Sequence, residues 1–165
     1  MFFLLFTDYS FTVNYMTEIK IVSEGAKLDE IMAIETSSFT SPWSREFFES
    51  VLSSDRAFIT EADFDGHTVG FACVALIPPE AELMNIAVDK KHRKKGFAAS
   101  LLDFSIKKAI SMGGEVMYLE VRESNTAARH LYEKFGFEMI GTRRNYYTLP
   151  RENAVIMRLD LKKER

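Results

Sequence analysis

The sequence predicts an α+β fold in which helices flank a single mixed β-sheet. The first observation is the order of hydrophobic patterns along the chain: a strand, two helices, three strands, a helix, a strand, a helix and two strands. The second is segment 115–121, EVMYLEV, which is apolar on both faces, as in a central or parallel strand. The third is composition, because 165 residues with 47% hydrophobic side chains are typical of one globular domain. We therefore expect residues 1–165 to form a single domain.

Local signals define the elements of the first half. Residues 18–23 alternate as strands do, whereas residues 26–36 carry apolar side chains at helical spacing. A Ser-Pro-Trp-Ser turn at 41–44 precedes a second helix over 45–52, for which Ser44 is the expected N-cap.

A hairpin and a third strand follow. Segments 56–63 and 67–77 are strand-like, and the Asp-Gly pair between them is a strong hairpin signal. Two prolines at 78–79 mark a turn before the strand 81–88. The remaining expected elements are the helix 97–112, the strand 115–121, the helix 125–135 and the strands 137–142 and 154–161, with glycines at 113, 114 and 136 closing the two helices.

The charge balance and the cysteine count exclude several classes of function. A net charge of −3 and a pI near 5.7 disfavour direct nucleic-acid binding, which requires a basic surface. The single cysteine, Cys73, lies in an apolar run, so we expect a buried thiol and no internal disulfide. Three scattered histidines do not predict a metal site.

The first fifteen residues are apolar but do not have the pattern of a targeting segment. They lack a basic region and a cleavage pattern, Asp8 interrupts them, and they are too short to span a bilayer. Two interpretations stay open: Met16 is the natural start, or residues 1–15 add a strand or an interface. We expect a cytoplasmic protein that does not associate with membranes.

The segment with the most chemical information joins the strand 81–88 to the helix 97–112. A basic turn at 90–95 is followed by Gly96 and the start of the helix. The unpaired N–H groups of a helix start attract an anion, and glycine allows close approach of the backbone. This pattern predicts a pyrophosphate site, although the spacing fits neither a Walker loop nor a dinucleotide fingerprint. The alternative is a surface turn with solvated lysines.

Three further positions could carry chemistry. Glu120 lies among apolar neighbours in a strand, where lost solvation would raise its pKa toward that of a general base; alternatively it pairs with Arg122 or a lysine. Asn125 could offer its amide to a ligand or cap a helix. Tyr132 could protonate a leaving thiolate or simply pack.

A fourth feature is the sequence RRNYY at 143–147, shortly before Pro150. Adjacent tyrosines in a loop could form the wall of a substrate groove. The alternative is an ordinary aromatic rim.

Several of these segments together resemble a known superfamily. The loop RKKGFA at 93–98 is similar to the pyrophosphate loop of the GNAT acetyltransferases, and 119–137 resembles their second core block. The segments SPWS at 41–44, NIAV at 85–88 and RRNYY make the chain resemble the RimI-type ribosomal-protein-alanine N-acetyltransferases. The resemblance covers residues 18 to 161 and departs from the common pattern where Ala98 replaces a second glycine.

The resemblance implies the GNAT fold, with a splayed sheet and acetyl-CoA lying between the strand 81–88 and the strand of Glu120. It implies a protein N-terminus as acceptor, that of a ribosomal protein, and no metal. Glu120 would be the base and Tyr132 the acid. The residues implied to bind the cofactor are Ile86, Ala87, Val88, Arg93, Lys94, Lys95, Gly96, Phe97, Ala98, Ala99 and Asn125, and those implied to bind the acceptor are Trp43, Tyr146 and Tyr147.

A mechanism follows from these assignments. A peptide α-amine of pKa about 8 is largely protonated at neutral pH and must lose a proton before it attacks a thioester. Glu120 could take that proton, the N–H of Val88 could stabilise the charge that develops on the carbonyl oxygen, and Tyr132 could protonate the departing sulfur.

Three alternatives remain at this point. Strand alternation would place Glu82 on one face with Met84, Ile86 and Val88, so Glu82 could be the base instead. The chain could also acetylate a small amine or an antibiotic, or be a non-enzymatic acyl-CoA-binding module.

Overall fold

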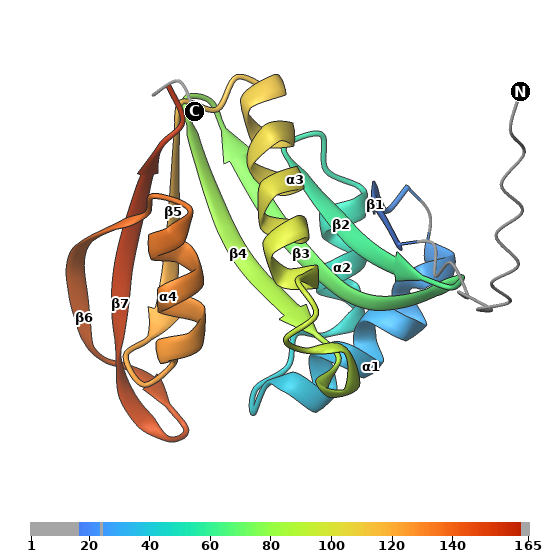
Figure 1. The fold of residues 1–165 in the computed structure, drawn as a ribbon, viewed down its shortest axis with the longest axis horizontal. Coiled ribbons are helices and arrows are strands. Elements are labelled where there is room, and N and C mark those ends of the chain that lie inside the picture. Colours follow the sequence, from blue (N-terminus) through green and yellow to red (C-terminus); the bar gives the residue numbers. More distant parts are fainter. Residues whose placement is uncertain (1–16, 24, 163–165) are drawn as a thin grey trace, which may run out of the picture.

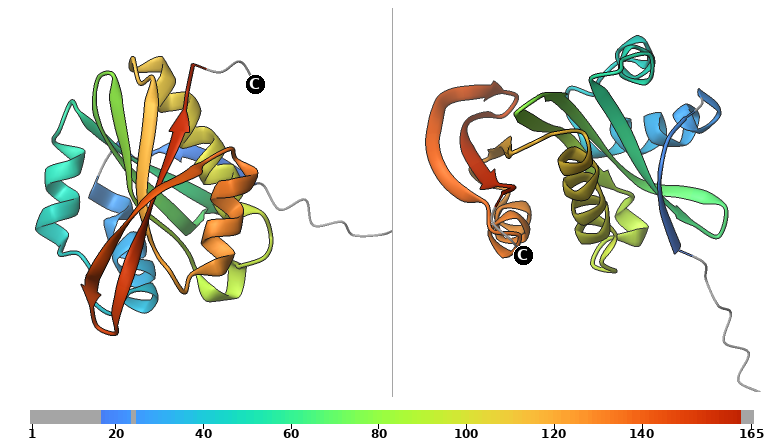
Figure 2. Two further views of the ribbon diagram at one scale, coloured as in Figure 1. Left: turned by 90° about the vertical axis from the view of Figure 1, so that its left-hand side faces the viewer. Right: turned by 90° about the horizontal axis from the view of Figure 1, so that it is seen from above.

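The computed structural model describes residues 17–23 and 25–162 of the chain, and within them it contains one seven-stranded mixed sheet with helices on both faces (Figures 1 and 2). This confirms the predicted α+β class. The expectations for residues 1–15 lie outside the described residues. The elements are β1 (Thr17–Ile21), η1 (Gly25–Lys27), α1 (Leu28–Ser38), α2 (Arg45–Leu52), β2 (Ala57–Phe64), β3 (His67–Ile77), β4 (Glu80–Val88), η2 (Lys90–His92), α3 (Phe97–Ser111), β5 (Val116–Arg122), α4 (Thr126–Lys134), β6 (Glu138–Thr148) and β7 (Arg151–Asp160).

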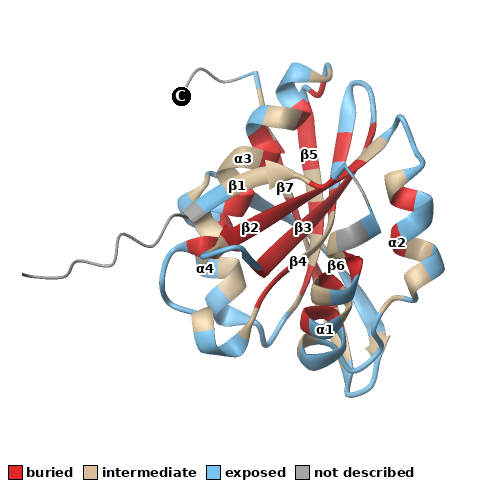
Figure 3. Cartoon of the chain, turned by 90° about the vertical axis from the view of Figure 1, so that its right-hand side faces the viewer, coloured by how far each residue is buried: buried red, intermediate tan, exposed pale blue. Residues whose placement is uncertain are grey.

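The sheet separates two hydrophobic cores. Helices α3 and α4 cover one face, whereas α1 and α2 cover the other face over β2 to β4 (Figure 2). Buried residues concentrate along these central strands (Figure 3). Cys73 in β3 is fully buried, as its apolar neighbours predict, and burial raises the pKa of its thiol.

The order of strands in the sheet is β1-β2-β3-β4-β5-β7-β6, and β4 and β5 form a parallel pair. Their pairing runs only from Glu80 opposite Val116 to Leu83 opposite Leu119. Beyond that point β4 continues to Val88 while β5 diverges from it, which opens the sheet (Figure 1). The splayed sheet that the resemblance implied is therefore present, and the split exposes backbone groups in the middle of the molecule.

A β-bulge in β4 overturns one prediction about the faces of this strand. Cys73 pairs with Asn85 and Val74 pairs with Leu83, so Met84 is an extra residue. An extra residue reverses the alternation of side chains beyond it. Ile86 and Val88 accordingly pack in the core under α3, whereas Met84 packs under α1. Glu82 and Met84 therefore do not share a face with Ile86 and Val88.

The tyrosine pair lies on a strand and not in a loop. The sequence predicts a loop after residue 142, but β6 extends to Thr148 and turns at Leu149 and Pro150 into β7. Tyrosine favours strands, and Tyr147 pairs with Glu152 of β7, whereas Tyr146 lies in an irregular stretch of β6 between Arg143 and Tyr147. Tyr146 and Tyr147 thus lie on an ordered hairpin.

Candidate active site

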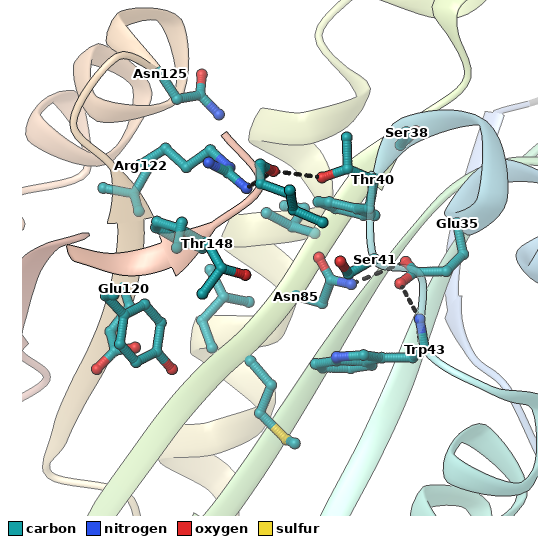
Figure 4. Close-up of a pocket in the computed structure, with 18 of the residues that line it drawn as sticks. Glu35, Ser38, Thr40, Ser41, Trp43, Asn85, Glu120, Arg122, Asn125 and Thr148 are labelled. Atoms are coloured by element: carbon teal, nitrogen blue, oxygen red, sulfur yellow. Dashed lines mark hydrogen bonds between the residues drawn. The ribbon is translucent and has the colours of Figure 1, made fainter. Parts of the chain in front are cut away.

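A cavity of about 590 Å³ lies where β4 and β5 separate (Figure 4). Its walls come from the end of α1 and the loop after it, from β4 and β5, from the start of α4 and from the β6–β7 hairpin. It brings together the following residues singled out from the sequence: Trp43, Glu82, Ile86, Glu120, Asn125, Tyr132, Tyr146 and Tyr147. The residues of the basic turn do not line it.

Glu120 is held in the cavity by donors from β6. The Arg143 guanidinium lies 2.9 Å from Oε1 of Glu120, and the Glu120 side chain is 20% exposed. A hydrogen bond with Glu120, together with burial, raises the pKa of the Tyr146 hydroxyl. The suggested partner Arg122 pairs instead with Glu152 at 3.2 Å, because the β6–β7 hairpin brings other side chains to β5.

Tyr132 reaches the same cavity from the opposite face of the sheet. It is 5% exposed, belongs to the core under α3 and lies 5.7 Å from the ring of Phe137. Burial, followed by the neighbouring Tyr147, raises the pKa of its phenol well above 10. Glu120 alternates with Leu119 and Val121, which face that core, so its side chain projects to the other face. The split allows both groups to face one space.

Asn125 serves as the N-cap of α4, since its Oδ1 accepts a hydrogen bond from the N–H of Ala128 at 3.2 Å. The capping alternative is therefore confirmed. The cap uses only the oxygen, and the residue also lines the cavity, so its amide nitrogen can still donate to a ligand.

The basic turn has the backbone geometry of an anion site. Lys94 and Gly96 have positive φ angles of 62° and 90°, and Gly96 caps α3 without a side chain. The first intrahelical bond runs from the N–H of Ser100 to the carbonyl of Gly96, at 3.0 Å. The N–H groups of Phe97, Ala98 and Ala99 precede that bond and therefore point outward from the helix start. A Cβ added at Gly96 would meet nothing within 4 Å, so the approach is open.

The free edge of β4 leads from this turn toward the cavity. The N–H of Asp89 bonds to the carbonyl of Val69 at 2.9 Å, and Val88 lies opposite Gly70. Because antiparallel partners alternate between bonded and non-bonded pairs, the backbone groups of Val88 and Ile86 point away from β3. The Val88 carbonyl accepts from Arg93 Nε at 3.0 Å, which leaves the Val88 N–H at the open edge. Ala87 pairs with Phe71, so its backbone faces β3 and is not at this edge.

Glu82 also faces the cavity and is exposed. It lies opposite Tyr118, two positions before Glu120 on β5. The structure therefore leaves both carboxylates within the same space.

Two anchoring networks were not anticipated from the sequence. Glu35 accepts from the Trp43 N–H at 2.8 Å and from Asn85 Nδ2 at 2.9 Å (Figure 4). The sequence indicates Glu35 only by placing a carboxylate on the apolar stripe of α1, four residues after Ile31.

The second network holds the tip of the β6–β7 hairpin. The Leu149 carbonyl accepts from Arg122 at 2.9 Å and from the Thr40 hydroxyl at 3.0 Å (Figure 4). The Arg122 guanidinium also lies 4.1 Å from the centroid of the Tyr147 ring. This network joins the hairpin both to β5 and to the loop after α1. No local sequence signal indicates it, because its partners are far apart in the chain.

Within residues 17–23 and 25–162, no helix has the length and apolar character that crossing a bilayer requires. No group of three or more His, Cys, Asp or Glu side chains in these ranges is arranged to hold a metal ion.

Comparison with known proteins identifies the family. The model of the acetyltransferase (GNAT) family matches residues 28–137. The [ribosomal protein bS18]-alanine N-acetyltransferases of Escherichia coli K12 and Haemophilus ducreyi are 38% and 36% identical, over 78% and 81% of this chain and 87% and 93% of theirs. The crystal structure of the E. coli ribosomal-protein-S18-alanine N-acetyltransferase superposes with a TM-score of 0.82 at 35% identity, covering 91% of this chain and 97% of that one. The chain therefore belongs to the acetyltransferase (GNAT) family.

Proposed function

We propose that this chain transfers the acetyl group of acetyl-CoA to the N-terminal α-amine of a protein, the alanine terminus of ribosomal protein bS18. The observation that carries the proposal is the split between β4 and β5, which lets Glu120 and Tyr132 face one cavity from opposite faces of the sheet. The names of the relatives support the choice of acceptor. A ribosomal acceptor implies a cytoplasmic enzyme. We further propose that residues 1–165 form one catalytic domain, with residues 1–15 as an extension.

The chain has groups that fit acetyl-CoA, which supplies the activated acetyl group. The helix-start N–H groups of Phe97, Ala98 and Ala99, together with the Lys94 and Lys95 side chains, suit the pyrophosphate. The open-edge groups of Ile86 and Val88 can pair with the amide-bearing pantetheine arm, as a neighbouring strand would. These groups lie along β4 and lead from the turn toward the cavity.

Glu120 is the base in the proposed reaction. Its carboxylate accepts a proton from the acceptor's α-ammonium, directly or through water, and Arg143 and Tyr146 hold it in place. An N–H at the open edge of β4 donates to the carbonyl oxygen as negative charge develops there, and one such donor contributes about 3 kcal/mol. Ile86 lines the cavity whereas Val88, the donor expected from the sequence, does not, so the Ile86 N–H is the better placed of the two.

Tyr132 is the acid. Since burial raises the pKa of its phenol, it stays protonated at neutral pH and can give its proton to the departing sulfur. Its position on the α3 side of the sheet separates it from Glu120, so one residue can release a proton while the other accepts one.

The acceptor enters between two walls of the cavity. Trp43 and the loop after α1 form one wall, and Tyr146 and Tyr147 on the β6–β7 hairpin form the other. An extended peptide terminus fits between two such walls, with its amine directed toward Glu120.

The test is acetyl-CoA turnover, followed by thiol release, on a panel of peptides that begin with Ala, Ser, Met or Leu. A matched Ala peptide with a blocked terminus and an internal lysine is the control. We expect turnover of the free Ala peptide, acetylation at its α-amine by mass spectrometry, and none of the blocked peptide. Acetylation of the lysine, turnover of small amines only, or CoA binding without turnover of any amine would refute the proposal.

A further inference from the structure

Glu35 is a buried carboxylate in the wall of the acceptor cavity, and the mechanism above assigns it no step. Glu35 is only 1% exposed. Burial raises the pKa of its carboxyl, although the hydrogen bonds from Trp43 and Asn85 act in the opposite direction. An apolar side chain at this position would avoid the cost of desolvating a carboxylate. The residue therefore needs an explanation other than core packing.

The two hydrogen bonds of Glu35 connect two separate walls of the cavity. The Trp43 N–H belongs to the loop between α1 and α2, whereas Asn85 is the residue after the bulge in β4. Glu35 thus joins the loop to the strand beside the split in the sheet, as the dashed lines in Figure 4 show.

Both hydrogen-bond partners of Glu35 face the cavity. Trp43 and Asn85 line the cavity and are half-buried. The Trp43 ring packs against Phe47 and Phe48 of α2, with centroids 4.3 and 5.9 Å away. The two bonds of Glu35 connect the Trp43 backbone to β4.

We infer that Glu35 is a positioning residue for the acceptor, because its carboxylate fixes the spacing between the Trp43 loop and β4 and hence the opening through which an acceptor terminus reaches Glu120. The inference rests on the proposed function for the identity of the acceptor. The Glu35 bonds themselves exist whatever the acceptor is.

The chemistry of the two bonds suggests a pair of variants. In Glu35→Gln, the amide oxygen can still accept from the Trp43 N–H. Its nitrogen can donate to Asn85 once that amide turns over to present its oxygen. Glu35→Met has a similar volume and no acceptor. Glu49→Gln and Glu49→Met on the exposed side of α2 are the matched controls.

Steady-state kinetics separate positioning from a general loss of structure. We expect Glu35→Met to raise the KM for the Ala peptide at least tenfold while leaving the KM for acetyl-CoA within threefold. Glu35→Gln and both Glu49 variants should stay within threefold of wild type for both substrates. All assays are made well below the melting temperature of each variant. If Glu35→Met does not fold, Asn85→Leu removes one of the two bonds and should raise the peptide KM at least threefold.

The chain has one tryptophan, so intrinsic fluorescence reports on Trp43 without any turnover. We expect acrylamide to quench ligand-free Glu35→Met more strongly than wild type, and Glu35→Gln to match wild type. Quenching that follows this order in a protein that acetylates no peptide would refute the proposed function while supporting the loop anchor. A folded Glu35→Met with unchanged quenching and unchanged peptide KM would overturn the inference. A peptide KM raised as much in Glu35→Gln as in Glu35→Met would also overturn the inference, because the charge of the side chain and not its bonding pattern would then matter.

Discussion

Replacing each of the two cavity carboxylates by its amide tests which one removes the proton from the acceptor. Glu120→Gln keeps the size of the side chain and can still accept from Arg143, but it cannot take a proton. The Arg143 side chain is 57% exposed, so the weakened ion pair costs under about 1 kcal/mol and the variant should fold. Glu82→Gln is the matched change on the other strand of the split.

Two estimates bound the expected fall in kcat/KM of Glu120→Gln. At pH 7 an α-amine of pKa about 8 is neutral in roughly one molecule in eleven, so an enzyme that must wait for that form loses about tenfold. A positioned general base contributes about 10²- to 10⁴-fold. We therefore expect kcat/KM of Glu120→Gln to fall by between about 10- and 10⁴-fold at pH 7, and that of Glu82→Gln to fall by less than about threefold.

The assay is thiol release with the Ala peptide between pH 6 and pH 9.5. As the pH rises past the pKa of the amine, more acceptor is already neutral and the ratio of wild-type to Glu120→Gln activity should shrink. Wild-type turnover in Glu120→Gln at pH 7 would refute the reasoning. A large loss in Glu82→Gln alone, with the same pH trend, would transfer the role of base to Glu82.

Three further outcomes are expected. Tyr132→Phe should lower kcat by about 100-fold or more, with the melting temperature within a few degrees of wild type because the ring still packs against Phe137; unchanged kcat would exclude Tyr132 as the acid. Gly96→Ala should lower stability by about 1 kcal/mol because φ is 90°, and weaken acetyl-CoA binding measured by calorimetry; unaltered affinity would argue against a pyrophosphate at this turn. Because burial raises the pKa of Glu35, its contribution to stability is fully present below pH about 4.3 and is lost as pH rises through the raised value. Urea unfolding should therefore show wild type losing stability relative to Glu35→Gln between pH 4 and pH 7, whereas parallel curves would contradict this.

The sequence by itself determined the order of elements, the mixed sheet and the basic turn, and it offered helix capping as one of two roles for Asn125. These features depend on interactions within a few residues: apolar periodicity, the Asp-Gly hairpin signal, and side chains that bond the backbone three positions away. The resemblance of its motifs also placed Glu120 and Tyr132 together, and the structure finds both at one cavity.

Only the tertiary structure decided which groups these residues meet. The bulge at Met84 arises from pairing with β3 and reverses the faces of β4, so alternation along the strand misplaced Glu82 relative to Ile86. Arg143 replaced Arg122 as the partner of Glu120 because β6 and β7 form a long hairpin beside β5. The Glu35 bonds join residues 8 and 50 positions apart. Local preferences select helix or strand, but the partners of a side chain depend on register and on chain segments that folding alone brings together.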